Sequence, residues 1–162
     1  MNFAHYSPAI WVLKNNFVNE KGDRITFKNH PFLFDIYKDL SRFQVIKKCA
    51  QVGVSVTMTL KTVYMAKFRN LTSIYTMPAD SDVSEFVKTK ADKIFISNPE
   101  LMKGANIDNV QLKQIGDSFI YYKGTRSKTA PISTTADFLI HDEKDRSDLN
   151  IIEQYRSRLG AS

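Results

Sequence analysis

The sequence predicts an α/β fold with a mainly parallel sheet flanked by helices. β-rich runs and helical segments alternate along the chain, which is the pattern of strands joined by helical crossovers. A length of 162 residues with 43% hydrophobic and 25% charged residues is typical of one soluble globular domain. No repeat, low-complexity tract or linker divides the chain, so we expect a single domain over residues 1–162.

The N-terminal part is predicted to be mostly helical. A helix follows Ser7-Pro8, and a turn lies at residues 21–23, where a glycine stands between lysine and aspartate. A second, short helix is expected from Pro31 to Leu40, because proline is tolerated in the first helical turn.

Strands and helices then alternate. Predicted strands occupy residues 43–48, 73–76, 110–115, 118–123 and 136–141, and predicted helices occupy residues 56–68, 81–96 and 149–159. Gly116-Asp117 supplies a turn between the third and fourth strands. Gly160 follows the last helix in the position of a C-cap.

Composition narrows the classes of function. The net charge of +6 favours polyanionic partners such as nucleic acids or nucleotides, although mildly basic proteins are common. The single cysteine, Cys49, excludes an internal disulfide, and a structural zinc site is not expected. The uncharged run at residues 49–60 is too short and too polar to span a membrane, and no signal peptide is apparent. We therefore expect a cytoplasmic protein.

The segment Lys48-Cys-Ala-Gln-Val-Gly-Val-Ser55 lies between a predicted strand and a predicted helix. A phosphate-binding loop needs backbone N–H groups at a helix N-terminus, a cation for the phosphates and a hydroxyl for Mg²⁺. Against the pattern GxxxxGK[ST], Gly53 and Ser55 fit, whereas Lys48 replaces the first glycine and Val54 the usual lysine. By itself the loop is also compatible with an ordinary strand–turn–helix connection.

The segment Phe138–Glu143 reads as an apolar strand that ends in two carboxylates. P-loop enzymes place an aspartate that holds Mg²⁺ at this point, beside a glutamate that activates water. Asp142 and Glu143 match these positions, and His141 departs from the apolar pattern. Many strands end in a charged turn, but here both motifs occur in the expected order and on the expected elements. Together they predict a nucleoside triphosphatase.

The two motifs resemble those of viral large terminase subunits, the ATP-driven motors that package DNA into phage heads. A lambda-like subset moves its lysine to the start of the loop, in the form K-x-A-x-V-G-x-S. The matching residues are Lys48, Ala50, Val52, Gly53 and Ser55. Further similar features are Met77-Pro78, Gly124-Thr125-Arg126 and Asp142-Glu143-Lys144-Asp145-Arg146, and the resemblance covers residues 31–159.

The resemblance implies a P-loop NTPase fold of the ASCE type, truncated after the Walker B strand and the helix that follows it. It implies that the chain is the front part of a terminase ATPase domain, because the family's coupling motif and C-terminal nuclease are absent from the sequence. The implied partners are double-stranded DNA, the small terminase subunit and the portal protein of the prohead. The resemblance also implies a homo-oligomeric ring that acts in the host cytoplasm, away from membranes.

The resemblance further implies ATP and Mg²⁺ as cofactors and assigns roles to residues. Ser55 and Asp142 would hold Mg²⁺, and Glu143 would polarise the attacking water as a catalytic residue. Lys48 would serve both binding and catalysis by reaching the β- and γ-phosphate oxygens. The residues implied to bind ATP are Lys48, Gln51, Val52, Gly53, Val54 and Ser55.

Several assignments stay open. Lys47 is an alternative to Lys48, but the alternation of a strand would send the two side chains to opposite faces. The arginine that many family members carry near the loop is absent, which leaves Arg126 and Arg146 as candidates, although each is more commonly a surface ion-pair residue. Candidates for an adenine-contacting wall, with core packing as the alternative, are Phe32, Tyr37 and Phe43.

Two other functions are compatible with parts of the sequence. A superfamily 2 helicase or translocase fragment also has a strand that ends in DExD, as Asp142–Asp145 does, but it would keep a normal GK[ST] loop, which Val54 contradicts. A non-catalytic basic α/β module for DNA binding or assembly, with a decayed phosphate loop, agrees with Val54.

Overall fold

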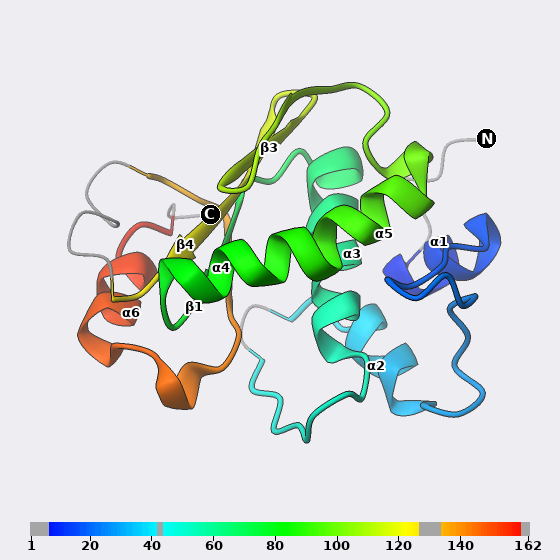
Figure 1. Ribbon diagram of the computed structural model, residues 1–162, viewed down its shortest axis with the longest axis horizontal. Coiled ribbons are helices and arrows are strands. Elements are labelled where there is room, and N and C mark those ends of the chain that lie inside the picture. The colour runs from blue at the N-terminus through cyan, green and yellow to red at the C-terminus, as the bar shows by residue number, and fades with distance from the viewer. Residues whose placement is uncertain (1–6, 42–43, 127–133, 160–162) are drawn as a thin grey trace.

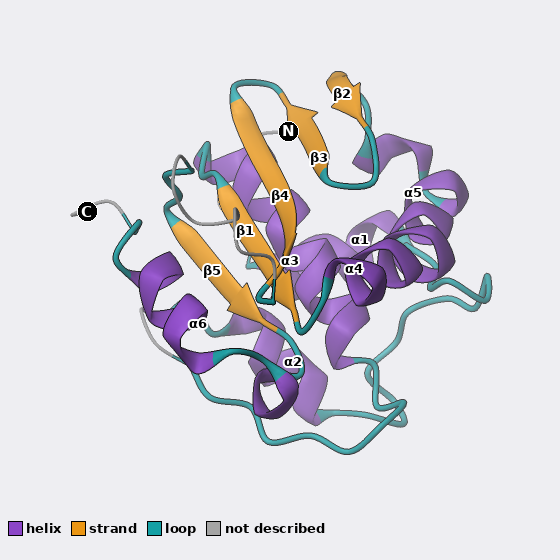
Figure 2. Ribbon diagram, turned by 60° about the vertical axis from the view of Figure 1, so that its left-hand side comes forward, coloured by secondary structure: helices purple, strands orange, loops and turns teal. Residues whose placement is uncertain are grey.

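The computed structural model describes residues 7–41, 44–126 and 134–159 as a twisted sheet with helices on both faces (Figures 1 and 2). The helices are α1 (Pro8–Asn15), α2 (Phe32–Lys38), α3 (Val54–Arg69), α4 (Asp80–Phe86), α5 (Asp92–Ser97) and α6 (Leu149–Arg156). The strands are β1 (Ser73–Met77), β2 (Ala105–Asp108), β3 (Leu112–Ile115), β4 (Ser118–Gly124) and β5 (Phe138–His141). The shorter elements are the π-helix η2 (Val87–Ala91) and the 3-10 helices η3 (Pro99–Leu101) and η4 (Lys144–Arg146). Across these residues, no helix is both long and apolar enough to cross a bilayer.

The five strands form one sheet in the order β2-β3-β4-β1-β5. β1 pairs in parallel with β4 and with β5, whereas β3 is antiparallel to both β2 and β4. Of these five strands only β3 therefore runs against the others, and the predicted α/β class with a mainly parallel sheet is confirmed. In the register, Met77 lies opposite Gly124, and Thr76 lies opposite His141. The carboxyl ends of β1, β4 and β5 consequently meet at one edge.

Helix α3 lies between the sheet and the N-terminal helices, as Figure 2 shows, and contacts α1, α2, β1, β3 and β4. Residues 57–66 of this helix are all buried, so it lacks the polar face of a surface helix. Its buried threonines Thr57 and Thr59 donate hydrogen bonds to carbonyls one turn earlier. The core fixes α3, and α3 in turn fixes the position of the loop at its N-terminus. The opposite face of the sheet packs against α6.

The structure confirms most predicted elements, corrects two of them and adds a strand that was not predicted. The strand predicted at residues 43–48 is wrong for residues 44–48, which pair with no described strand, while Phe43 lies outside the described residues. Gln44 accepts a hydrogen bond from the buried Lys61 of α3 instead, and Val45 is 79% exposed. β-propensity alone does not make a strand without a neighbour to pair with.

The other two differences are the strand β2, which was not predicted, and an interruption in the helix predicted over residues 81–96. β2 has the sequence Ala-Asn-Ile-Asp, which is poor in residues that favour strands, and it forms because β3 offers a partner. The helix is interrupted by η2, a turn of π-helix between α4 and α5. Such π-helical turns frequently occur at functional sites.

Gly124, the last residue of β4, packs against the start of α4. Its backbone N–H donates to Asp80 Oδ1 at 2.9 Å. A Cβ atom at this position would meet the backbone nitrogen of Asp80 and would lie 2.6 Å from the carbonyl carbon of Ala79. Both are backbone atoms that no side-chain rotation can move away, so only glycine allows this approach.

We predict that Gly124→Ala lowers the free energy of unfolding by about 1–3 kcal/mol, the usual cost of overpacking. Gly116→Asn is a matched control, because Gly116 has a φ of 59° and open space around it, and asparagine tolerates this conformation. Urea unfolding of both variants measures the difference. Equal stability of the Gly124→Ala variant and the native chain would contradict the close approach.

Candidate functional site

The turn over residues 49–53 leads directly into α3. Gln51 and Gly53 both have left-handed backbone conformations, with φ of 61° and 80°. Gly53 is the N-cap of α3, and no described side chain caps the helix, so its first N–H groups remain available to an anion. A Cβ on Gly53 would lie 3.1 Å from Leu33 Cδ1, so α2 packs against this turn as well.

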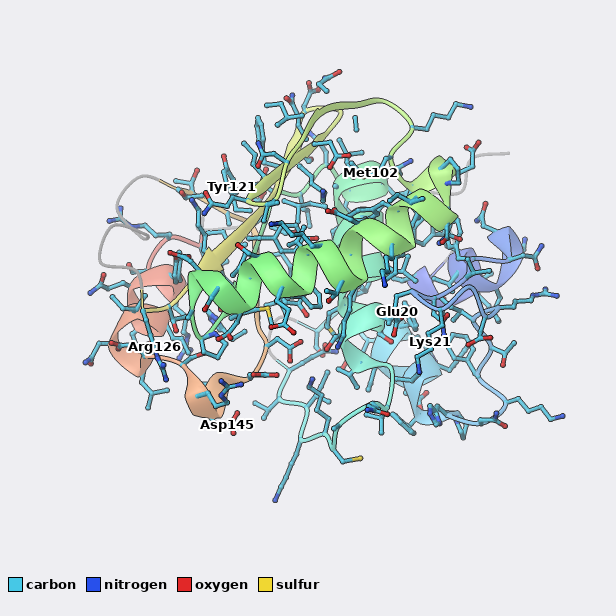
Figure 3. All side chains as sticks on the ribbon, in the orientation of Figure 1. Glu20, Lys21, Met102, Tyr121, Arg126 and Asp145 are labelled. Carbon is cyan, nitrogen blue, oxygen red and sulfur yellow. The ribbon has the colours of Figure 1, made fainter. Side chains whose placement is uncertain are left out.

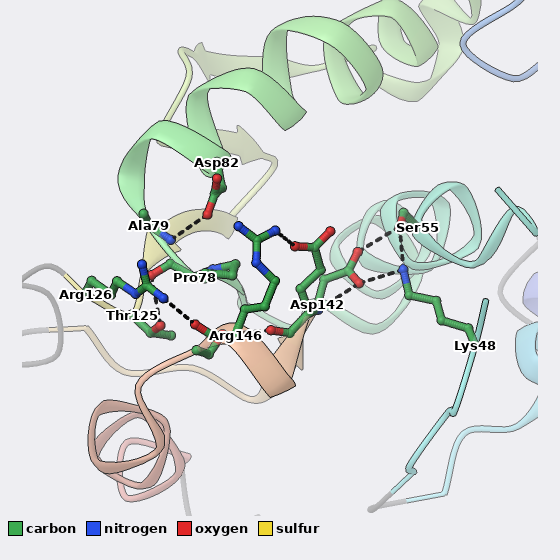
Figure 4. Close-up of polar contacts among 11 residues, drawn as sticks. Lys48, Ser55, Pro78, Ala79, Asp82, Thr125, Arg126, Asp142 and Arg146 are labelled. Atoms are coloured by element: carbon green, nitrogen blue, oxygen red, sulfur yellow. Dashed lines mark hydrogen bonds and ion pairs between the residues drawn. The ribbon is translucent and has the colours of Figure 1, made fainter. Parts of the chain in front are cut away.

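Three predicted site residues meet where α3 begins and β5 ends (Figure 4). Lys48 Nζ lies 2.9 Å from Asp142 Oδ1 and donates a hydrogen bond of 3.3 Å to Ser55 Oγ. Ser55 Oγ donates to Asp142 Oδ2 at 2.8 Å. The structure therefore brings the predicted phosphate lysine and both predicted metal-binding residues into direct contact.

Asp142 is only 7% exposed but is surrounded by donors. Burial by itself raises the pKa of Asp142, but hydrogen bonds from Lys48, Ser55 and Tyr75, together with the charge of Lys48, outweigh burial and lower the pKa. The carboxylate is consequently held in its charged form. A charged, partly desolvated carboxylate beside a hydroxyl is a donor set that suits a hard cation such as Mg²⁺.

Lys47, the alternative phosphate lysine, is exposed and does not line the site. The strand alternation that was expected to separate the two lysines does not exist, because residues 44–48 are not a strand. The two lysines nevertheless differ, because Lys48 lines the cavity and Lys47 does not. Lys48 is drawn toward Asp142, with which it makes an ion pair.

Tyr75 of β1 is a site residue that the motifs did not reveal. Its ring is fully buried, and its hydroxyl donates to Asp142 Oδ2 at 2.8 Å. Burial, followed by the neighbouring charge of Asp142, raises the pKa of Tyr75 well above its usual value, so the hydroxyl stays protonated. The only signal in the sequence is an aromatic residue with a polar tip in a short apolar strand.

Glu143 follows directly and has a left-handed backbone with a φ of 52°. Its Oε2 accepts a hydrogen bond of 2.7 Å from Arg146 Nη1. Arg126 Nη2 donates to the carbonyl oxygen of Arg146 at 3.0 Å. Both arginines therefore hold the turn that carries Glu143.

The segment Gly124-Thr125-Arg126 ties this turn to β1. The backbone N–H groups of Thr125 and Arg126 donate to the carbonyls of Met77 and Pro78. Thr125 Oγ1 also donates to Pro78 O and accepts from the N–H of Asp148, the N-cap of α6. Three segments that resemble terminase motifs in the sequence, at residues 77–78, 124–126 and 142–146, thus form one hydrogen-bonded unit beside the site (Figure 4).

A cavity of about 680 Å³ extends from this site toward the N-terminal segment. Residues 48–55, Asp142 and Glu143 line one end, and residues 19–37 contribute most of the other walls. Glu20 and Lys21, which line the cavity, lie on the segment between α1 and α2. Arg126 and Asp145 lie on the opposite side of the molecule (Figure 3). The volume lies in the range of small-molecule and cofactor sites.

Of the three aromatic residues considered for the base, one lines this cavity. Tyr37 does so together with Leu33. Phe32 is 44% exposed and does not contribute to the walls, and Phe43 lies outside the described residues.

His141 precedes Asp142, and its Nδ1 lies 2.5 Å from Thr76 Oγ1. Burial, followed by the charges of Lys144 and Arg156, lowers the pKa of His141 from 6.5 to about 4. Between pH 6.5 and about 4, His141 therefore takes up a proton in the unfolded chain but not in the folded chain. The stability that the neutral imidazole contributes is present above pH 6.5 and is lost as the pH falls toward 4.

We predict that acidification from about pH 7 to pH 5 destabilises the native chain more than a His141→Gln variant, because glutamine does not titrate. Asp142 stays charged in both states across this window, because its pKa is 3.8 in the unfolded chain and lower in the folded chain. Urea unfolding of both proteins at the two pH values provides the measurement. The same loss of stability in both would show that the imidazole is not the titrating group.

A family model described as the phage terminase large subunit gpA, ATPase domain, matches residues 20–156. No curated protein and no solved structure matches the chain. The matched residues include the loop before α3, the carboxylates after β5 and every strand of the sheet. The chain therefore belongs to the family of phage terminase large subunit gpA ATPase domains.

Proposed function

We propose that this chain binds ATP with Mg²⁺ in the cavity at the carboxyl ends of β1 and β5, as the ATPase part of a DNA-packaging motor. The observation that carries the proposal is the direct contact among Lys48, Ser55 and Asp142. It joins a basic group, a hydroxyl and a carboxylate at the open N-terminus of a helix. These are the groups that phosphoryl transfer requires.

Lys48 supplies the positive charge that Val54 lacks. Its ammonium contacts Asp142, its side chain is 28% exposed, and it lines the cavity from the start of the loop. The N–H groups of residues 51–55, opened by the left-handed Gln51 and Gly53, cradle the phosphates. An aligned set of N–H groups with one lysine compensates phosphate charge without the usual GK pair.

Ser55 and Asp142 are the residues that hold Mg²⁺. Their oxygens are 2.8 Å apart, and a cationic ammonium already contacts both, so this position favours positive charge. The described residues contain no group of three or more His, Cys, Asp or Glu side chains that could hold a metal. Mg²⁺ commonly binds one or two protein groups together with phosphate oxygens and water. When bound, it neutralises charge on the β- and γ-phosphates.

Glu143 orients and polarises the attacking water. It lines the cavity next to Asp142, and its left-handed backbone is fixed by the hydrogen bonds of the following turn. Its pairing with Arg146 is half exposed, and exposed ion pairs of this kind contribute only ~0–1 kcal/mol. The carboxylate therefore exchanges Arg146 for a water molecule at little cost.

Leu33 and Tyr37 contribute apolar side chains to the lining of the cavity, and the base would lie against them. The net charge of +6 favours double-stranded DNA as a partner. The small subunit, the portal of the prohead, a homo-oligomeric ring and action in the host cytoplasm complete the proposal, with this chain as the front part of the ATPase domain.

The family match favours this function over the alternatives. It names a terminase ATPase domain and not a helicase, which agrees with the absence of a GK[ST] loop. A non-catalytic basic module would need neither the contact of Lys48 with Asp142 nor a carboxylate at position 143.

We predict that Lys48→Ala weakens the binding of a fluorescent ATP analogue by at least tenfold, about 1.4 kcal/mol, because the phosphates lose their lysine. Lys47→Ala is the matched control, since Lys47 is exposed and outside the cavity, and it should bind like the native chain. Titrations in the presence of Mg²⁺ compare the three proteins. Equal, small effects of both changes would argue against a phosphate lysine at position 48.

We predict that Glu143→Gln keeps nucleotide affinity but lowers hydrolysis in the assembled motor by ~10²–10⁴-fold, the usual cost of losing a positioned base. Glutamine keeps the size of the side chain but cannot take up a proton. Steady-state phosphate release measures turnover, and the analogue titration measures affinity. Near-normal turnover would show that Glu143 is an ordinary charge at the end of a strand.

A further inference from the structure

The hydroxyl of Tyr75 reaches Asp142 from inside the core. Tyr75 is 0% exposed, and its ring lies 5.1 Å from the ring of Phe86 and 5.7 Å from that of Tyr122, measured between centroids. From this aromatic cluster its hydroxyl donates to Asp142 Oδ2 at 2.8 Å. Burying a hydroxyl is costly unless it makes a hydrogen bond, and Asp142 provides the acceptor.

Tyr75 differs from the other donors to Asp142 in one respect. Lys48 and Ser55 both line the cavity, and both are needed by the phosphates and the metal under the proposed function. Tyr75 does not line the cavity, so it touches neither ligand. When Lys48 and Ser55 turn to the nucleotide, Asp142 Oδ1 keeps the N–H of Glu143 at 3.0 Å, and Tyr75 is the side-chain donor that still holds Oδ2.

We infer that Tyr75 is a positioning residue that fixes the orientation of the Asp142 carboxylate toward Mg²⁺. This inference rests on the proposed function of Asp142 as a residue that holds the metal. Groups behind a metal ligand orient it, and their loss typically lowers metal affinity by ~10–100-fold. The single hydrogen bond of 2.8 Å from a rigidly packed ring meets this requirement.

Tyr122 is a control that distinguishes the hydrogen bond to Asp142 from the packing of the aromatic cluster. It lies in the same cluster, is 1% exposed, and its ring contacts both Tyr75 and Phe86. Its hydroxyl nevertheless has no hydrogen-bond partner among the described residues. Two buried tyrosines with similar surroundings thus differ in whether the hydroxyl reaches the site, and they form a matched pair for mutation.

The experiment compares Tyr75→Phe with Tyr122→Phe in the full chain. A fluorescent ATP analogue is titrated first without metal and then with increasing Mg²⁺, which gives the metal affinity of the nucleotide complex. We expect Tyr75→Phe to lower this Mg²⁺ affinity by ~10–100-fold while binding without metal is unchanged. Tyr122→Phe should leave both unchanged. Thermal unfolding of both variants, which keep their rings, verifies that each is folded.

The outcomes separate the inference from the proposed function. If the native chain does not bind the analogue, the proposed function fails and the inference fails with it. If the native chain binds and depends on Mg²⁺, but both variants retain its Mg²⁺ affinity or lose it equally, only the role of Tyr75 is overturned. A loss confined to Tyr75→Phe supports the inference. Should Tyr75→Phe be unfolded, 3-fluorotyrosine at position 75 keeps the ring and the hydroxyl and, with one added fluorine, makes the hydroxyl a stronger donor to Asp142. Unchanged Mg²⁺ affinity in that protein would also overturn the inference.

Discussion

The ion pair between Lys48 and Asp142 is the interaction on which the candidate site depends. It joins the loop before α3 to the end of β5 over a distance of 2.9 Å, and Ser55 contacts both partners. A carboxylate that is only 7% exposed would be costly to bury without such partners. The pair therefore holds the loop before α3 against the end of β5 and helps to keep Asp142 charged, although residues 44–48 form no strand to anchor the loop.

The rest of the fold supplies fixed positions for this contact. Parallel pairing of β1 with β4 and β5 brings three carboxyl ends to one edge, and the close approach at Gly124 sets α4 against β4. Thr125 and Arg126 then fasten the turn after β5 to the end of β1. Because these bonds involve mainly backbone groups, they fix the direction of Glu143 while leaving its side chain only weakly paired.

The sequence predicted the parts of the structure that local pattern determines. The motifs predicted that Gly53, Ser55, Asp142 and Glu143 lie at a turn, a helix start and a strand end, and the structure has them there. Tyr75 was missed because its role arises from pairing between β1 and β5, which brings residues 67 positions apart into contact. The strand predicted at residues 43–48 and the unpredicted β2 have a common cause, since a strand depends on whether a neighbour pairs with it.

The most direct test of the account is a crystal structure of the chain with Mg²⁺ and a non-hydrolysable ATP analogue. We expect the phosphates to lie against residues 51–55 and Lys48 Nζ to move from Asp142 to a phosphate oxygen. We also expect Mg²⁺ between the nucleotide and the oxygens of Ser55 and Asp142, with the Tyr75 hydroxyl still bonded to Asp142. A nucleotide bound elsewhere, or a Lys48 that still pairs with Asp142 beside bound phosphates, would contradict the account.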